Sequence, residues 1–170
     1  MIISIVGNKP PNYDASVRIE SADTVVRISK MNWLDSGLAG HRTDVLYLEP
    51  NIFWWFYSPQ SRRQSQLCSI PEVHIRNSWW ERVGQRLLDE GILTRGQVHV
   101  IPSDAEKKLP GCTTFGMAVY DLHRRFPHAV LLGAGSDFGE KRARFFTKHV
   151  HGGEVPFMDK LIEQGILVPI

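Results

Sequence analysis

The chain has 170 residues, of which 42% are hydrophobic and 22% are charged, a balance typical of one globular domain with its own core. Its 20 basic and 18 acidic residues leave a net charge of +2, which argues against a nucleic-acid-binding protein because such proteins usually carry a strong basic excess. Its longest apolar runs, residues 2–6 and 52–57, are too short to cross a bilayer, and no basic segment typical of a signal peptide precedes the first run, so we expect one cytoplasmic domain over residues 1–170 with no transmembrane segment.

Two cysteines, Cys68 and Cys112, are too few for a disulfide framework, and no pattern of cysteine and histidine spacing suggests a zinc site. Free cysteines are typical of a reducing compartment, which agrees with a cytoplasmic protein. We therefore expect no zinc site.

The first predicted element is a strand at residues 2–6, an apolar run interrupted only by Ser4. Its four β-branched residues and its lack of alternation indicate a strand buried on both faces. Gly7 and Asn8 follow, and this pair can form a tight loop that lets a ligand approach the backbone. Open α/β sheets bind nucleotides at such loops, although an ordinary turn is the better interpretation of this run taken alone.

Three further elements follow the first loop. A short helix is predicted within residues 14–20, and strands are predicted at residues 24–29 and 45–48. The connections between the strands are too long for hairpins, which favours an α/β layer over a meander. Arg27, inside the second strand, is either an edge residue that extends its charge into water or a charge directed at a ligand cleft.

The middle of the chain supplies mainly scaffold. Residues 72–76 alternate like a half-buried strand, and residues 78–81 have the form of a capping box, which predicts the start of an amphipathic helix. Gly91 is a plausible stop for that helix. A strand at residues 97–101 and a charged surface turn at residues 104–108 follow.

A second amphipathic helix is predicted to extend to about Arg125, with Thr113 or Thr114 as its N-cap. The free amides at the start of such a helix, together with small hydroxyl side chains, form a natural phosphate site. Most capped helices bind nothing, so this feature by itself does not establish a ligand.

The last part of the chain repeats the arrangement of the first strand. An apolar strand at residues 129–132 ends at Gly133, which gives a second strand with a glycine exit. The final helix is predicted at residues 154–164, and Gly165 is its stop.

Several common nucleotide and hydrolase motifs are absent from the sequence. There is no P-loop, no GxGxxG after either glycine exit, no GxSxG elbow and no Asp-x-Asp pair. Clustered carboxylates would be needed to hold a divalent ion on a nucleotide diphosphate. A nucleotide site in this chain would therefore neutralise phosphate with amides, hydroxyls and side-chain donors.

Three ordered blocks of the sequence resemble the sialyltransferase family that includes the animal enzymes and some bacterial relatives. The first block resembles the large sialylmotif, the second the small sialylmotif, and the third the His-x-x-x-x-Glu motif. They cover roughly half of the chain and consist of residues 4–8, 19–28 and 40–44, then residues 113–116 through 130–133, then residues 149–154.

The resemblance implies a single Rossmann-like domain, a variant of the A-type glycosyltransferase fold, with a mostly parallel sheet flanked by helices. It further implies an inverting transfer of a CMP-activated acidic sugar to a glycan hydroxyl, with no metal and no resident cofactor. The partners would be the nucleotide-sugar donor and the glycan acceptor, and a homo-oligomer sharing an acceptor site is possible.

The same resemblance implies roles for individual residues. His149 would be the general base on the acceptor hydroxyl, with His151 as the rival base, because histidine has a pKa near working pH. Ser29 stands where the family usually has Asn, and Asn32 follows three residues later. The implied donor-binding residues are Gly7, Asn8, Ser29, Asn32, Thr113, Thr114, Gly116 and Gly133, and the supporting residues are Arg27, Asp44 and Glu154.

Two alternatives to a transferase stay open from the sequence. One is a non-catalytic nucleotide-binding protein on the same fold, suggested by the short chain, by Ser29 and by Phe115, which stands between the threonines and Gly116. The other is a partner-docking protein that uses the aromatic run at residues 52–57, although that run is more simply buried core.

Overall fold

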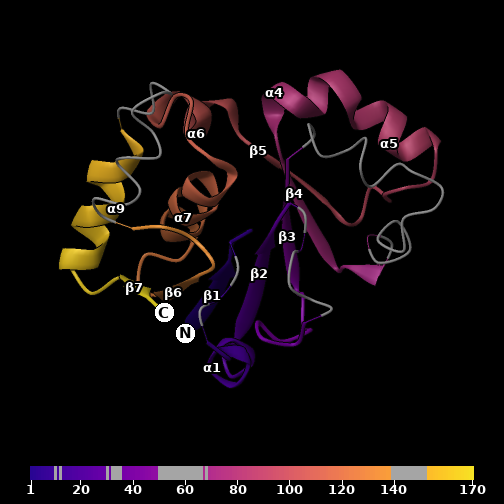
Figure 1. Cartoon of the computed structure of the whole chain (residues 1–170). Helices are drawn as coiled ribbons and strands as arrows, with labels where there is room; N and C mark the ends of the chain where they lie inside the picture. The colour runs from indigo at the N-terminus through magenta and orange to yellow at the C-terminus, as the bar shows by residue number, and fades with distance from the viewer. Residues whose placement is uncertain are drawn as a thin grey trace.

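A fully parallel sheet separates two layers of helices in the computed structural model of the chain (Figure 1). The structure describes residues 1–9, 11, 13–29, 31, 36–49, 67, 69–138 and 153–170. Within these residues the sheet has seven strands in the order β5-β4-β3-β2-β1-β6-β7. The predicted α/β fold with a mostly parallel sheet flanked by helices is confirmed.

The elements alternate between strand and helix along most of the chain. The strands are β1 (Ile2–Val6), β2 (Thr24–Ile28), β3 (Val45–Leu48), β4 (Glu72–Arg76), β5 (Val98–Ile101), β6 (Val130–Ala134) and β7 (Leu167–Pro169). The helices are α1 (Ser16–Glu20), α4 (Asn77–Trp79), the π-helical segment η2 (Trp80–Gly84), α5 (Gln85–Asp89), α6 (Ser103–Lys108), α7 (Thr114–Arg125) and α9 (Glu154–Glu163).

Strand β1 occupies the position at which the strand order reverses. Ile5 is in register with Val26 of β2 on one side and with Gly133 of β6 on the other. From β1 the order runs to β5 in one direction and to β7 in the other, which makes the space between β1 and β6 the topological switch point. The prediction of a central strand is confirmed, since every residue of β1 after Ile2 is buried.

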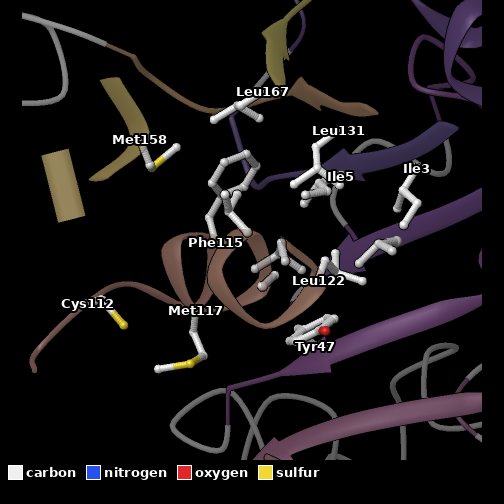
Figure 2. Packing of buried hydrophobic residues seen from close by; sticks show 14 of the residues in the cluster. Ile3, Ile5, Tyr47, Cys112, Phe115, Met117, Leu122, Leu131, Met158 and Leu167 are labelled. Carbon is white, nitrogen blue, oxygen red and sulfur yellow. The ribbon is translucent and has the colours of Figure 1, made fainter. Parts of the chain in front are cut away.

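The two faces of the sheet carry separate hydrophobic cores, because successive side chains of a strand point to opposite faces. On one face α7 and α9 pack against the sheet, and Figure 2 shows Phe115 and Leu122 of α7 beside Ile5 of β1. On the other face Leu87 of α5 packs on Leu46 of β3 in one cluster, and α1 packs on β1 and β2 in another. Figure 1 shows α7 and α9 at one side of the sheet and α5 at the other.

Three predicted elements differ from the structure. The strand at residues 72–76 is buried on both faces rather than half-buried, because helices cover both sides of the sheet. Residues 78–81 form no capping box: helix α4 already begins at Asn77, with Arg76 as N-cap and no side-chain cap bond. Residues 104–108 belong to α6 and not to a surface turn.

One edge strand, β7, was not predicted from the sequence. Strand β7 pairs with β6 after the turn at Gly165, whose φ of +68° confirms the predicted glycine stop of α9. Gly133 lies inside β6 and does not end it. None of the helices in the described ranges has the length and apolar character needed to cross a bilayer.

Arg27 holds a loop in place, so both predictions for its side chain are wrong. It lies in β2, between β1 and β3, and it is fully buried. Its Nε donates to the carbonyl of Arg42 and to Thr43 Oγ1, both at 3.0 Å, and its Nη2 donates to two further carbonyls at 2.8 Å. Burial lowers the pKa of the Arg27 guanidinium to about 10, which still leaves the side chain charged at neutral pH.

Replacing this arginine should destabilise the protein. Arg27→Met fills a similar volume but leaves the carbonyls of Ala39, Gly40 and Arg42 without their buried donor, and we expect a loss of about 3 kcal/mol or more in the free energy of unfolding. The control is Arg18→Met on the exposed side of α1, which should change this free energy by less than about 0.5 kcal/mol. Urea unfolding of both variants measures the difference, and equal midpoints would contradict the anchoring role.

Candidate functional site

The loops that leave β1 and β6 meet at the switch point. Gly7 N donates to the carbonyl of Ala134 at 2.8 Å, and Lys9 N donates to the carbonyl of Gly135 at 2.9 Å. Ligands of open α/β sheets bind in the crevice outside the carboxyl ends of the strands at such a switch point. We call residues 7–9 and 135–137 the switch-point loops, and we take them as the core of the candidate site.

Glycine is required at both contact positions of these loops. A Cβ at Gly7 would lie 2.3 Å from the carbonyl oxygen of Gly135 and 3.3 Å from the ring of Phe115. Gly135 has a φ of +61°, and its Cβ would lie 3.0 Å from the Lys9 carbonyl oxygen. The structure therefore places the predicted residue Gly7 at the centre of the site, with half-buried Asn8 next to it.

An ion pair joins the two switch-point loops at the surface. Lys9 Nζ contacts Asp137 Oδ2, and the Lys9 side chain is 51% exposed. Sequence reasoning did not single out either residue. The available signal was position, since each lies two residues beyond a glycine that follows a buried strand.

The start of helix α7 faces the same edge of the sheet, but two carboxylates of the protein already accept from the Thr113 amide and from the hydroxyls of Thr113 and Thr114. Thr113 is the N-cap, as predicted, and accepts from Gly116 N at 3.0 Å. Thr113 N and Oγ1 donate to the two carboxylate oxygens of Glu154, both at 2.7 Å. Thr114 Oγ1 donates to Glu49 Oε2 at 2.6 Å. The negative charge bound at this helix start therefore comes from carboxylate side chains of the protein itself.

Glu154 is buried and is the first residue of α9, so its contacts join α9 to α7. A Cβ at Gly116 would lie 2.4 Å from the carboxyl carbon of Glu154, which explains the glycine at this position. The second and third sequence blocks are thus physically connected through Thr113, Gly116 and Glu154.

The remaining predicted site residues fall into three groups. Ser29 lies at the carboxyl end of β2, is buried with a φ of +48°, and donates its N–H to the Tyr47 carbonyl at 2.8 Å. It shares the edge of the switch-point loops. Asn32, His149 and His151 lie outside the described residues, as do Cys68 and the aromatic run at residues 52–57.

Three predicted residues are not brought to the crevice. A Cβ at Gly133, inside β6, would lie 2.7 Å from the Phe138 ring, so packing explains this glycine. Asp44 precedes β3, at the opposite edge of the sheet, where it accepts from Val25 N at 2.8 Å and pairs with Arg42 at 2.8 Å. Arg27 is the buried loop anchor described above.

Cys112 is buried in front of α7 and is not an activated thiol. Burial raises its pKa to about 11, although the nearby charge of Arg76 acts in the other direction. Arg76, at the carboxyl end of β4, donates from Nη2 to the Cys112 carbonyl at 2.7 Å. A thiol with a raised pKa is a poor nucleophile at neutral pH.

No protein-family model and no curated protein matches this chain. Among solved structures it is similar to the sialyltransferase CstII from Campylobacter jejuni in complex with a substrate analogue, CMP-3FNeuAc. The TM-score is 0.59 at 14% sequence identity, and the match covers 98% of this chain and 78% of the other. The similarity shows that the two chains share a fold.

The contact between the switch-point loops gives a prediction for stability. Gly7→Ala forces a methyl group against the Gly135 carbonyl and should lower the free energy of unfolding by about 1–3 kcal/mol. Gly96→Ala is the matched control, because no atom lies within 4 Å of its added Cβ, and it should leave stability unchanged or raise it by up to about 1 kcal/mol. Denaturant midpoints measure both, and a loss that is equal in the two variants would argue against a close contact at Gly7.

Proposed function

We propose that this protein is a metal-independent, inverting glycosyltransferase of the sialyltransferase type, which transfers an acidic sugar from a CMP-linked donor to a glycan hydroxyl. One observation supports the proposal most directly. This chain shares its fold with a sialyltransferase that was solved with a CMP-sugar analogue, and its switch-point loops, which require glycine, lie at the edge where such sheets bind ligands. The glycan acceptor, a cytoplasmic location and self-association stay predictions from the sequence.

The donor phosphate would be met by the switch-point loops. Its negative charge requires compensation as the nucleotide leaves. Lys9 is the cation in these loops, and its half-exposed side chain would turn from Asp137 to the phosphate. Asn8, between Gly7 and Lys9, would contact the phosphate or the ribose. Because Glu154 and Glu49 occupy the start of α7, we assign Thr113 and Thr114 to holding the loops around the nucleotide.

The acceptor hydroxyl requires a general base, for which His149 is our candidate and His151 the alternative. Glu154 would act as a positioning residue for this base. It is bonded to the start of α7, and His149 precedes it by five residues, a length of chain that spans at most about 18 Å. The anchor at Glu154 would thus limit how far this base can lie from the carboxyl edge.

A second candidate function is nucleotide binding without transfer. It is favoured by the same occupied helix start, since donors already bound to Glu154 and Glu49 cannot stabilise the charge that develops on the phosphate as a nucleotide leaves. This candidate predicts CMP binding with neither transfer nor donor hydrolysis for any acceptor.

Nucleotide selectivity tests the proposed donor site. In calorimetric titrations with EDTA present, we expect CMP to bind and UDP and GDP to bind at least about tenfold more weakly, a difference of about 1.4 kcal/mol. Lys9→Met should weaken CMP binding, whereas Lys160→Met on α9 serves as the charge-matched control. Failure of all three nucleotides to bind would overturn both candidate functions.

Transfer activity separates the two candidates. His149→Ala should lower the transfer rate by about 100-fold or more, the usual contribution of a general base, while leaving CMP affinity within about twofold. His151→Ala decides between the two histidines, and His128→Ala is an exposed control. Unchanged turnover in both His149→Ala and His151→Ala would remove the assigned base.

A further inference from the structure

A second group of polar residues lies at the amino edge of the sheet, where β4 and β5 begin. Glu72 and His74 belong to β4, and His99 of β5 is in register with His74. One ligand atom from each of the three side chains lies within 4.8 Å of the other two. His74 is fully buried, Glu72 is half-buried and His99 is exposed, so the group extends from the core to the surface.

His74 is held in a fixed orientation. Its ring is stacked between Tyr47, with a centroid distance of 4.6 Å, and His99, with a centroid distance of 4.8 Å. Its Nδ1 lies 3.5 Å from Asp121 Oδ2, and the same oxygen accepts from Tyr47 OH at 2.8 Å. A buried carboxylate behind one ring nitrogen orients the imidazole and favours the proton on that nitrogen.

The other ring nitrogen of His74, Nε2, faces Glu72 and Arg125. Arg125 Nη1 lies 3.1 Å from His74 Nε2 and 3.5 Å from His74 Nδ1. Glu72 Oε1 also contacts Nε2.

The Glu72 carboxylate and His74 Nε2 thus face the same point in space, where the negative charge of the carboxylate attracts a cation. Arg125 supplies one from the last turn of α7, with Nη2 at 3.3 Å from Glu72 Oε1. Its side chain is 26% exposed, so it can rotate away into solvent and leave this point to another cation.

We propose that Glu72, His74 and His99 form a binding site for a divalent transition-metal ion such as Zn²⁺ or Co²⁺, which takes the position of the Arg125 guanidinium. Two imidazoles and one carboxylate are a donor set that suits these ions. Asp121 and Tyr47 would stand behind His74, as the partners behind metal-bound histidines do.

The surroundings of the site provide access and an open position. A cavity of about 460 Å³ at this edge is lined by Glu72, His99 and Arg125, together with Asp44 and Gln97. Three protein ligands leave one position of a tetrahedral ion for water or a small anion from this cavity. The site lies at the opposite edge of the sheet from the switch-point loops, so it is independent of the proposed transfer reaction.

Metal titration of the EDTA-treated, untagged chain tests the proposal. We expect one Co²⁺ per chain with visible absorption bands of a protein-bound ion, and one Zn²⁺ per chain by calorimetry. Loss of a hydrogen-bond partner behind a metal ligand usually lowers metal affinity by roughly 10- to 100-fold. His99→Gln and Glu72→Gln each remove a direct ligand, so each should lower the Zn²⁺ affinity by at least this factor. The exposed control His128→Gln and the double variant His149→Gln, His151→Gln should leave affinity unchanged.

A further variant tests the competition with arginine. Arg125→Met should raise the Zn²⁺ affinity, because the competing cation is gone, whereas Arg18→Met, which removes an equal charge from α1, should not. No binding of either ion, or binding that His99→Gln and Glu72→Gln leave intact, would overturn the proposal. Far-ultraviolet circular dichroism of each variant establishes that it is folded.

Discussion

The contact between the loops that follow β1 and β6 sets the arrangement of the carboxyl edge. A parallel sheet whose order reverses at β1 leaves a space between two diverging connections, and this space is usually open. In this chain the backbones of Gly7 and Gly135 are in contact at the base of this space, because neither residue has a side chain to separate them. Residues 8, 9, 136 and 137 are thereby brought to one place from segments more than a hundred positions apart in the sequence.

Much of the fold follows from local patterns in the sequence. The run at residues 2–6 has no polar alternation, and this pattern correctly predicts a strand covered on both faces. Thr113 is a good N-cap by residue type, and the structure confirms it. Local patterns failed to predict an element that depends on tertiary contacts. Strand β7 is three residues long and forms only because β6 offers an unpaired edge.

The candidate site could be predicted only in part, for the same physical reason. Gly7 was identifiable because a glycine after a buried strand is a local signal. Glu154 was named as a supporting residue by the family resemblance, but its contact with the start of α7 was not predicted, since nothing in the sequence says which side chain will reach a helix start 41 positions away. The register that places His74 beside His99 likewise depends on strand pairing, which residue spacing does not encode.

The carboxyl edge of the sheet attracts negative charge and the amino edge attracts positive charge. This difference follows from the parallel arrangement of the strands. At the carboxyl edge the start of α7 attracts negative charge, and Glu154 satisfies it at 2.7 Å from Thr113 N. A bound anion must then be compensated by mobile groups such as the half-exposed Lys9. At the amino edge Glu72 and Asp121 both stay ionised beside His74, so this edge attracts cations, and Arg125 serves that need in the protein itself. The charge distribution of the sheet would therefore direct an anionic donor to the carboxyl edge and a metal ion to the amino edge.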